Sequence, residues 1–302
     1  MRPRSFARTI VASSLAGAIG LGTAAATAHA GDPARYQPYY SIFDRGGALI
    51  PGDDTDWVPQ GLAYWPERDD LIISYYDYGG TQNSRLAVID RITGAKQAIF
   101  ELPEKGHVGG IAMTDDNLWI ASTGTGVSRI TEKALESTPD GGTLPVASKR
   151  DLAETSYAYF DGGNLWVGKW EPDPHQPRFA YRYPLTENDR PAAKPNLKIP
   201  VPISVQGMAV VGNKVLFSRS GGQGHDADSV LDVYPLDNTV GSPTKSIVAP
   251  NMSEGLAVGA NQVHVVYESA SGAYDDADYR VKTVHHAPVT SVFGAGVSLR
   301  GL

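Results

Sequence analysis

Gln60-Gly61-Leu62-Ala63 is the first copy of a short phrase that recurs along the chain. The other copies are Gly109-Gly110-Ile111-Ala112, Val205-Gln206-Gly207-Met208-Ala209, Glu254-Gly255-Leu256-Ala257 and a degenerate Ser156-Tyr157-Ala158-Tyr159. Counted from residues 61, 110, 157, 207 and 255, the copies are 49, 47, 50 and 48 residues apart. This period is typical of four-stranded propeller blades. The sequence therefore predicts an all-β, five-bladed β-propeller.

Each copy is followed by a polar turn and a second apolar run, such as Leu118-Trp119-Ile120-Ala121 and Leu165-Trp166-Val167-Gly168. Third strands with period-two alternation are predicted at 85–90, 179–183 and 230–234, and outer strands at 95–102, 196–201 and 244–249. A single helical turn is expected, at 131–136. A β-sandwich with the same number of strands is the alternative, but it does not predict the repeated phrase.

The fifth repeat stops after an expected third strand at 279–284, so another segment must complete that blade. We expect the N-terminal segment Tyr36–Phe43 to supply the outer strand, with Thr290–Ser298 as the alternative. Closing the ring with the opposite end of the chain covers sheet edges that would otherwise promote aggregation.

Residues 1–30 have the features of an export signal: a basic start with Arg2, Arg4 and Arg8, an apolar run and an Ala28-His29-Ala30 end. Residues 31–302 are then one propeller domain, secreted and extracellular. The absence of cysteine leaves the core and the strand ladders to stabilise it. The net charge of -7, without a basic cluster, argues against nucleic acid as a partner. No second apolar segment predicts a membrane span, and we expect a monomer.

Aligning the repeats places polar residues in rings at one mouth of the central channel. Gln60, Gly109, Ser156, Gln206 and Glu254 precede the inner strands. Two further rings follow the second strands, and the substrate-binding candidates drawn from all three are Gln60, Tyr75, Tyr76, Lys169, Trp170, Gln206, Arg219 and Tyr267. These residues differ from blade to blade, which favours one asymmetric ligand site. Alternatively, the glutamine and glutamate side chains only satisfy the backbone of neighbouring blades.

Glu254, Glu268 and His107 are the catalytic candidates. Two carboxylates from one blade can divide acid and base roles if one is kept protonated. A salt bridge to Lys169 or Arg219 would explain the same residues without catalysis. His107 lies before the second inner strand and is the histidine best placed to reach the channel, whereas His285 and His286 are expected at the surface. No metal-binding spacing of histidines and no Gly-x-Ser-x-Gly motif occurs.

Three acidic clusters suit a divalent metal such as calcium: Asp53, Asp54 and Asp56, then Asp226 and Asp228, then Asp275, Asp276 and Asp278. Aspartate is also an ordinary turn residue, and these segments join strands. Among the tryptophans, Trp119 and Trp166 are expected in blade cores, while Trp57 and Trp170 are placed where a ligand could touch them.

The phrases Val58-Pro59-Gln60-Gly61-Leu62-Ala63, Ser74-Tyr75-Tyr76-Asp77 and Ser253-Glu254-Gly255-Leu256-Ala257 resemble those of exported actinobacterial propeller proteins of unassigned activity. Glu254-Gly255 is also similar to the Glu-Gly that opens the first strand of gluconolactonase-type propellers. That resemblance implies Glu254 as a ligand of a divalent metal, although those proteins have six blades and their companion Asn and Asp ligands have no match here.

Two functions follow from these observations. The first is a hydrolase or lactonase that acts on a small molecule or carbohydrate at the channel mouth. The second is a non-catalytic propeller that binds a glycan or another protein, which would repeat shallow sites between blades. The variation among the ring residues favours the single site.

Overall fold

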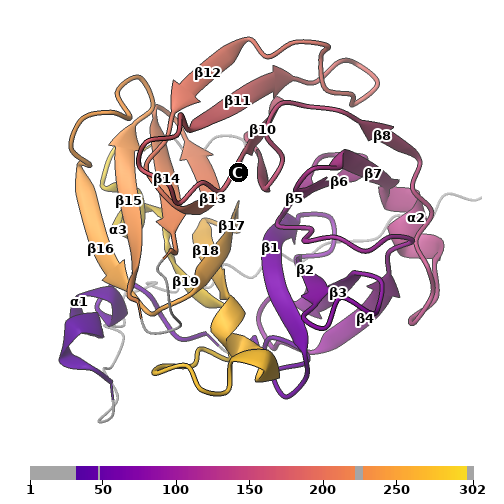
Figure 1. The fold of residues 1–302 in the computed structure, drawn as a ribbon, viewed down its shortest axis with the longest axis horizontal. Coiled ribbons are helices and arrows are strands. Elements are labelled where there is room, and N and C mark those ends of the chain that lie inside the picture. The colour runs from indigo at the N-terminus through magenta and orange to yellow at the C-terminus, as the bar shows by residue number, and fades with distance from the viewer. Residues whose placement is uncertain (1–31, 47, 222–226, 298–302) are drawn as a thin grey trace, which may run out of the picture.

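Five antiparallel sheets are arranged radially around a central channel in the computed structural model, which describes residues 32–46, 48–221 and 227–297 (Figure 1). The chain is a five-bladed β-propeller, as the repeat predicts. Each of the first four blades is a four-stranded sheet, and consecutive strands run from the channel to the rim. The predicted export signal lies outside the described residues.

The strands follow the repeat in order. Blade 1 has β1 (Trp57–Trp65), β2 (Asp70–Asp77), β3 (Arg85–Asp90) and β4 (Lys96–Glu101). Blade 2 has β5 (Gly110–Met113), β6 (Asn117–Ser122), β7 (Gly126–Thr131) and β8 (Ser148–Arg150). Blade 3 has β9 (Tyr157–Phe160), β10 (Asn164–Gly168), β11 (Phe179–Pro184) and β12 (Leu197–Pro200). Blade 4 has β13 (Val205–Val211), β14 (Lys214–Arg219), β15 (Ser229–Pro235) and β16 (Lys245–Ala249), and blade 5 has β17 (Ser253–Gly259), β18 (Gln262–Tyr267) and β19 (His285–Pro288).

The glycines of the repeated phrase stand where inner strands of adjacent blades touch. A Cβ on Gly255 of β17 would lie 2.5 Å from the Leu62 backbone nitrogen of β1, and one on Gly207 would lie 2.6 Å from the Glu254 carbonyl oxygen. Real Cβ atoms do not approach backbone this closely, so only glycine fits. The phrase is therefore the signature of the narrow ring around the channel.

The degenerate third copy has Tyr157 in place of that glycine. Tyr157 pairs across the sheet with Gly168 of β10, and a Cβ on Gly168 would lie 2.1 Å from the phenol ring. The tyrosine ring thus occupies the space above a glycine on the next strand. Blade 3 therefore packs closely with a glycine on its second strand, whereas the other blades have this glycine on the first strand.

The N-terminal side of the chain completes blade 5, as expected, but through a different segment. Backbone hydrogen bonds join Asp44 to His286, and Ala48 and Ile50 to the 282–284 stretch. The expected strand Tyr36–Phe43 is wrong, because η1 (Ala34–Tyr36) and α1 (Gln37–Tyr40) form there instead. Pro38 at the start of α1 suits a first helical turn and not a paired strand. The tail does not supply the strand either, since α3 covers Val289–Phe293.

The third strand of blade 5 also differs from expectation. It is β19, which follows the segment expected at 279–284. His285 and His286 therefore lie in a sheet, and His285 is buried, so their expected surface position is wrong. Tyr39 of α1 hydrogen-bonds the His285 ring at 2.9 Å and accepts a 2.6 Å hydrogen bond from the Tyr267 hydroxyl. Burial lowers the pKa of His285 to about 3, so this ring is neutral.

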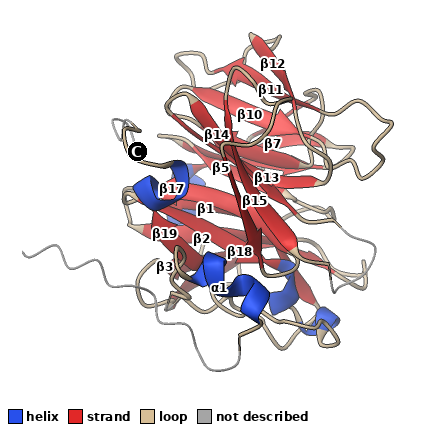
Figure 2. Cartoon of the chain, turned by 90° about the vertical axis from the view of Figure 1, so that its left-hand side faces the viewer, coloured by secondary structure: helices blue, strands red, loops and turns tan. Residues whose placement is uncertain are grey.

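Short helices lie around the strand body (Figure 2). The predicted helical turn is confirmed as α2 (Glu132–Ser137), whose N-cap Thr131 accepts a hydrogen bond from the Ala134 amide. Two further turns, η2 (Glu268–Ala270) and η3 (Gly272–Tyr274), follow β18. In the described part of the chain, no helix is long and apolar enough to cross a membrane.

Candidate functional site

A cavity of about 500 Å³ opens at the channel mouth where the inner strands begin. Four residues of the predicted first ring line it: Gln60, Gly109, Ser156 and Gln206. Glu254, the fifth, lies directly beneath, because the Gln206 Nε2 donates a 2.6 Å hydrogen bond to its Oε1. The repeat alignment thus located this mouth from the sequence.

The centre of the site is a pair of carboxyl groups. Glu254 is 1% exposed and is hydrogen-bonded to Glu268, whose carboxylate also accepts a hydrogen bond from the Gln60 side-chain amide. Burial and the neighbouring Glu268 charge raise the pKa of Glu254 well above its usual range. Two adjacent carboxylates cannot both ionise without a large cost, so the raised pKa of Glu254 favours a pair that keeps one proton, on Glu254.

Two phenols and an imidazole flank this pair. The Tyr76 and Tyr274 hydroxyls lie 3.0 Å apart, and the Tyr76 ring packs on His107 with centroids 4.4 Å apart. Burial and the nearby Glu268 charge raise the pKa of both tyrosines, so both remain protonated. Burial lowers the pKa of His107, which leaves a neutral ring at pH 7. The site therefore offers O–H donors beside a single negative charge.

The opposite wall comes from blade 3. Lys169, Trp170 and Glu171 line the cavity, and the Lys169 ammonium pairs with Glu171 at 3.0 Å. Trp170 is 36% exposed, and its Nε1 donates a hydrogen bond to the Ser220 carbonyl, which fixes the ring orientation. Since Lys169 is neutralised locally, Glu268 is left as the main charge facing the cavity.

Three predicted binding residues lie away from the mouth, and those expectations are wrong. Tyr75 is buried within blade 1, Tyr267 is buried against Tyr39, and the Arg219 guanidinium pairs with Asp232 at 2.6 Å. Successive side chains on a strand point to opposite faces. Tyr76 and Glu268 therefore reach the channel, whereas the residues directly before them, Tyr75 and Tyr267, do not.

Three lining residues were missed by the sequence reasoning: Glu171, its neighbour Pro172, and Tyr274. Tyr274 and Glu171 fall outside the aligned rings, in the segments 268–284 and 169–178 that connect second and third strands. The length of these two connections was the available signal, because insertions at one face of a repeat fold form its binding surface.

One aspartate in each of the first two acidic clusters is engaged in an ion pair. Asp53 pairs with Lys282 at 2.8 Å and Asp228 with Arg35 at 2.8 Å, while Asp226 lies outside the described residues. Within the described ranges, no group of three or more His, Cys, Asp or Glu side chains is arranged to hold a metal. At Glu254 itself the Gln206 amide directs an N–H, a donor, at the carboxyl group.

Trp57 also lies away from the channel. It lines a separate cavity of about 160 Å³ at the edge of blade 1, under the Arg85 guanidinium, which is 3.8 Å from the ring centroid. Trp119 and Trp166 are fully buried in blade cores, as predicted.

No protein-family model matches the chain, and no curated protein is significantly similar to it in sequence. Solved structures share its fold. A GH43_1 enzyme from Xanthomonas citri is 12% identical with a TM-score of 0.51, covering 80% of this chain and 90% of that one. A tail fibre of Staphylococcus aureus phage P68 is 12% identical with a TM-score of 0.53, covering 80% of this chain and 51% of that one. The PQQ-bound aldose sugar dehydrogenase of Streptomyces coelicolor is 18% identical, with a TM-score of 0.47 and coverages of 74% and 76%. The first two likenesses, with TM-scores above 0.5, concern the fold alone.

Proposed function

We propose that the channel mouth hydrolyses a small, uncharged ester or lactone, with Glu268 as general base and Glu254 as general acid. The observation that carries this proposal is the buried, hydrogen-bonded Glu254–Glu268 pair with one proton at the base of a cavity. Two carboxyl groups that share a proton activate water and protonate a carbonyl in the same step. Glycosidases instead hold their two carboxyl groups about 5 Å or more apart, flanking the scissile glycosidic bond.

The reaction balances within the site. Glu268 takes a proton from water as the water oxygen attacks the carbonyl carbon, and Glu254 gives its proton to the carbonyl oxygen. One of the paired Tyr76 and Tyr274 hydroxyls donates to the other, which leaves the second O–H to donate to the same oxygen. As the tetrahedral diol collapses and its C–O bond breaks, one diol hydroxyl returns a proton to Glu254, and the proton held on Glu268 passes to the departing alkoxide.

Charge favours an uncharged substrate. Glu268 repels an incoming carboxylate, while Lys169 is paired with Glu171 and attracts anions little. The same repulsion promotes release, because ester or lactone hydrolysis creates a carboxylate product. The Trp170 face provides an apolar wall for a sugar-like or aromatic body.

A panel of chromogenic esters and sugar lactones tests the proposal by continuous proton release. We expect turnover by the mature protein and a loss of about 100-fold or more in Glu268→Gln and Glu254→Gln. Glu67→Gln, an exposed carboxylate, is the matched control. Equal rates in the wild type and both dyad variants would refute the mechanism.

A non-catalytic glycan-binding site is the second candidate, and the half-exposed Trp170 favours it because sugar rings stack on such faces. If sugars raise the unfolding midpoint, if Trp170→Ala abolishes that shift and if no panel compound is hydrolysed, binding is the function. Export of the mature chain and a monomeric state belong to both proposals. Mass spectrometry of the secreted N-terminus and light scattering test them.

A further inference from the structure

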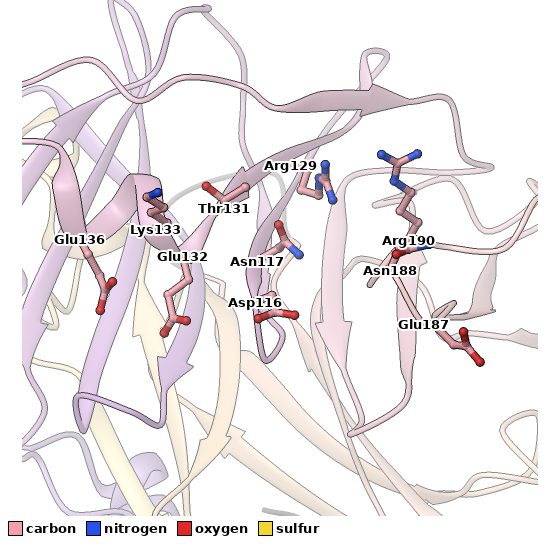
Figure 3. A pocket seen from close by; sticks show the side chains of 10 residues that line it. All are labelled: Asp116, Asn117, Arg129, Thr131, Glu132, Lys133, Glu136, Glu187, Asn188 and Arg190. Carbon is pink, nitrogen blue, oxygen red and sulfur yellow. The ribbon is translucent and has the colours of Figure 1, made fainter.

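A second cleft, of about 720 Å³, lies between blades 2 and 3, whereas the carboxyl pair belongs to blade 5. Figure 3 shows its lining, which includes Arg129 on β7, Lys133 on α2 and Arg190 from the loop after β11. In this view the three cationic groups lie toward the upper end, and the carboxylates of Glu132, Glu136, Asp116 and Glu187 point toward the lower end. One end of the cleft is therefore positively charged and the other end negatively charged.

The guanidinium groups of this cleft have unused donors. Several other arginines are held by acceptors, as in the Arg91–Asp69 pair at 2.7 Å and the Arg280 contacts with backbone carbonyls. Among the described residues, the Arg129 and Arg190 side chains have neither an ion pair nor a hydrogen bond, and the Arg129 Nε is buried without a partner. A buried donor without a partner destabilises the fold, and an oxyanion at this position would accept its hydrogen bond.

The loop that carries Arg190 is fixed against blade 2. The Asp189 carboxylate accepts hydrogen bonds from the Thr114 hydroxyl and, at 2.5 Å, from the Asn117 amide. Within the loop, the Thr186 amide donates to the Arg190 carbonyl at 2.9 Å. Arg190 is thus presented from a braced hairpin opposite Arg129, and such preorganisation lowers the entropic cost of binding.

We propose that this cleft binds a phosphate or sulfate group, with Arg129 and Arg190 as its ligands. Guanidinium groups match tetrahedral oxyanions through paired N–H donors. The carboxylates at the other end repel a second anion but accept hydrogen bonds from hydroxyl groups. The charge pattern therefore suits an oxyanion carried on a hydroxyl-rich body, such as a sugar phosphate, as well as the free ion.

Isothermal titration calorimetry at constant ionic strength tests the site on the whole mature chain, with inorganic phosphate, glucose 6-phosphate and glucose as probes. We expect saturable binding of the phosphate probes and none of glucose. Tighter binding of glucose 6-phosphate than of inorganic phosphate would identify the hydroxyl-rich ester as the source, and equal binding the free ion. Arg129→Gln and Arg190→Gln should each weaken binding at least ten-fold, and Arg129→Lys should restore part of it.

Lys194→Gln is the matched control, since it removes one positive charge from an exposed position outside the cleft. Absence of saturable phosphate binding, or an equal loss in all three glutamine variants, would overturn the proposal. Arg190 is exposed, so Arg190→Gln decides the matter even if Arg129→Gln does not fold. Failure of the ester hydrolysis proposal leaves this result unaffected, because the two sites share no lining residue.

Discussion

Replacing Glu254 with glutamine removes a titratable proton from the base of the channel while keeping the shape of the side chain. A glutamine can still accept the hydrogen bond from Gln206 and donate one to Glu268, so it mimics the protonated acid. The substitution therefore removes the proton of Glu254 without changing how its side chain packs. Its effect on the free energy of unfolding should depend on pH and not on a new cavity.

The sign follows from the raised pKa of Glu254 in the native protein. The native state binds this proton more tightly than the unfolded chain, whose glutamates titrate near 4.3. The proton's contribution to stability is complete below that pH and is lost as the pH rises toward the native pKa. Within this window the wild type should lose about 1.4 kcal/mol per pH unit relative to Glu254→Gln.

Urea unfolding of both proteins at pH 5 and pH 6 measures this difference, with Glu67→Gln as a control for the loss of one carboxylate. Comparing variants cancels the titration of histidines and other groups common to both chains. Parallel pH profiles for the wild type and Glu254→Gln would show that Glu254 is ionised in the native state. The shared-proton mechanism would then have no acid.

Three further outcomes follow from the contacts. Gly168→Ala should destabilise the fold by about 2 kcal/mol or more, because its Cβ would lie 2.1 Å from the Tyr157 ring. Gly163→Ala, with open space around the new Cβ, should not destabilise it, and thermal melts compare the two variants. Tyr39→Phe should cost about 1–3 kcal/mol in urea unfolding, since two buried hydrogen bonds are lost, and an unchanged midpoint would contradict the anchoring of α1 on blade 5 through Tyr39. EDTA should leave hydrolysis unchanged, because an N–H is directed at Glu254; a rate restored only by calcium would favour the metal-ligand alternative.

The repeat predicted most of the fold because its glycines mark the positions where inner strands of neighbouring blades lie too close together for a side chain. In four blades, a Cβ at the glycine of the phrase would collide with the backbone of the neighbouring inner strand, so glycine is required there. In blade 3 the requirement is met differently, by Tyr157 over Gly168, and there the phrase is weak. Spacing still located the blade, since the second-strand tryptophan pattern remained.

Ring closure was less predictable. The need to complete blade 5 and cover its edge favoured a strand at Tyr36–Phe43, but the aromatic side chains of this segment, part of which is α1, are buried in the hydrophobic core. The pairing instead uses the 44–50 stretch, which contains turn-forming residues and little alternation. Tertiary packing overrides local propensity at such edges.

The strand pleat explains which of the predicted site residues reach the channel. Two adjacent rings after the second strands were polar enough to suggest a site. In blades 1 and 5 only the second of these rings reaches the cavity, whereas in blade 3, where β10 ends at Gly168, Lys169 of the first ring and Trp170 of the second both line it. Tyr76, Trp170 and Glu268 belong to the ring that faces inward. The sequence alone did not show which ring faces the channel. Polar residues on the other face of the strand pair with groups in their own blade, as Arg219 does with Asp232.

The asymmetry of the site arises where the repeat is interrupted. In blade 2 the second and third strands are joined by a short turn at 123–125, which contributes only Thr123 to the mouth. In blade 5 the strand β18 ends in η2, so that Glu268 turns over the channel toward Glu254 and the following η3 places Tyr274 beside Tyr76. In blade 3 the connection at 169–178 forms the wall that carries Trp170. The regular inner strands supply a rigid ring of amides, and the irregular connections supply the second carboxyl group and the aromatic walls. Replacing 268–278 with a short turn keeps the pairing of 282–284 with Ala48 and Ile50, and should therefore leave a folded propeller in which Glu254 has lost both its hydrogen-bond partner Glu268 and the charge that helps to raise its pKa; urea unfolding against pH measures that loss.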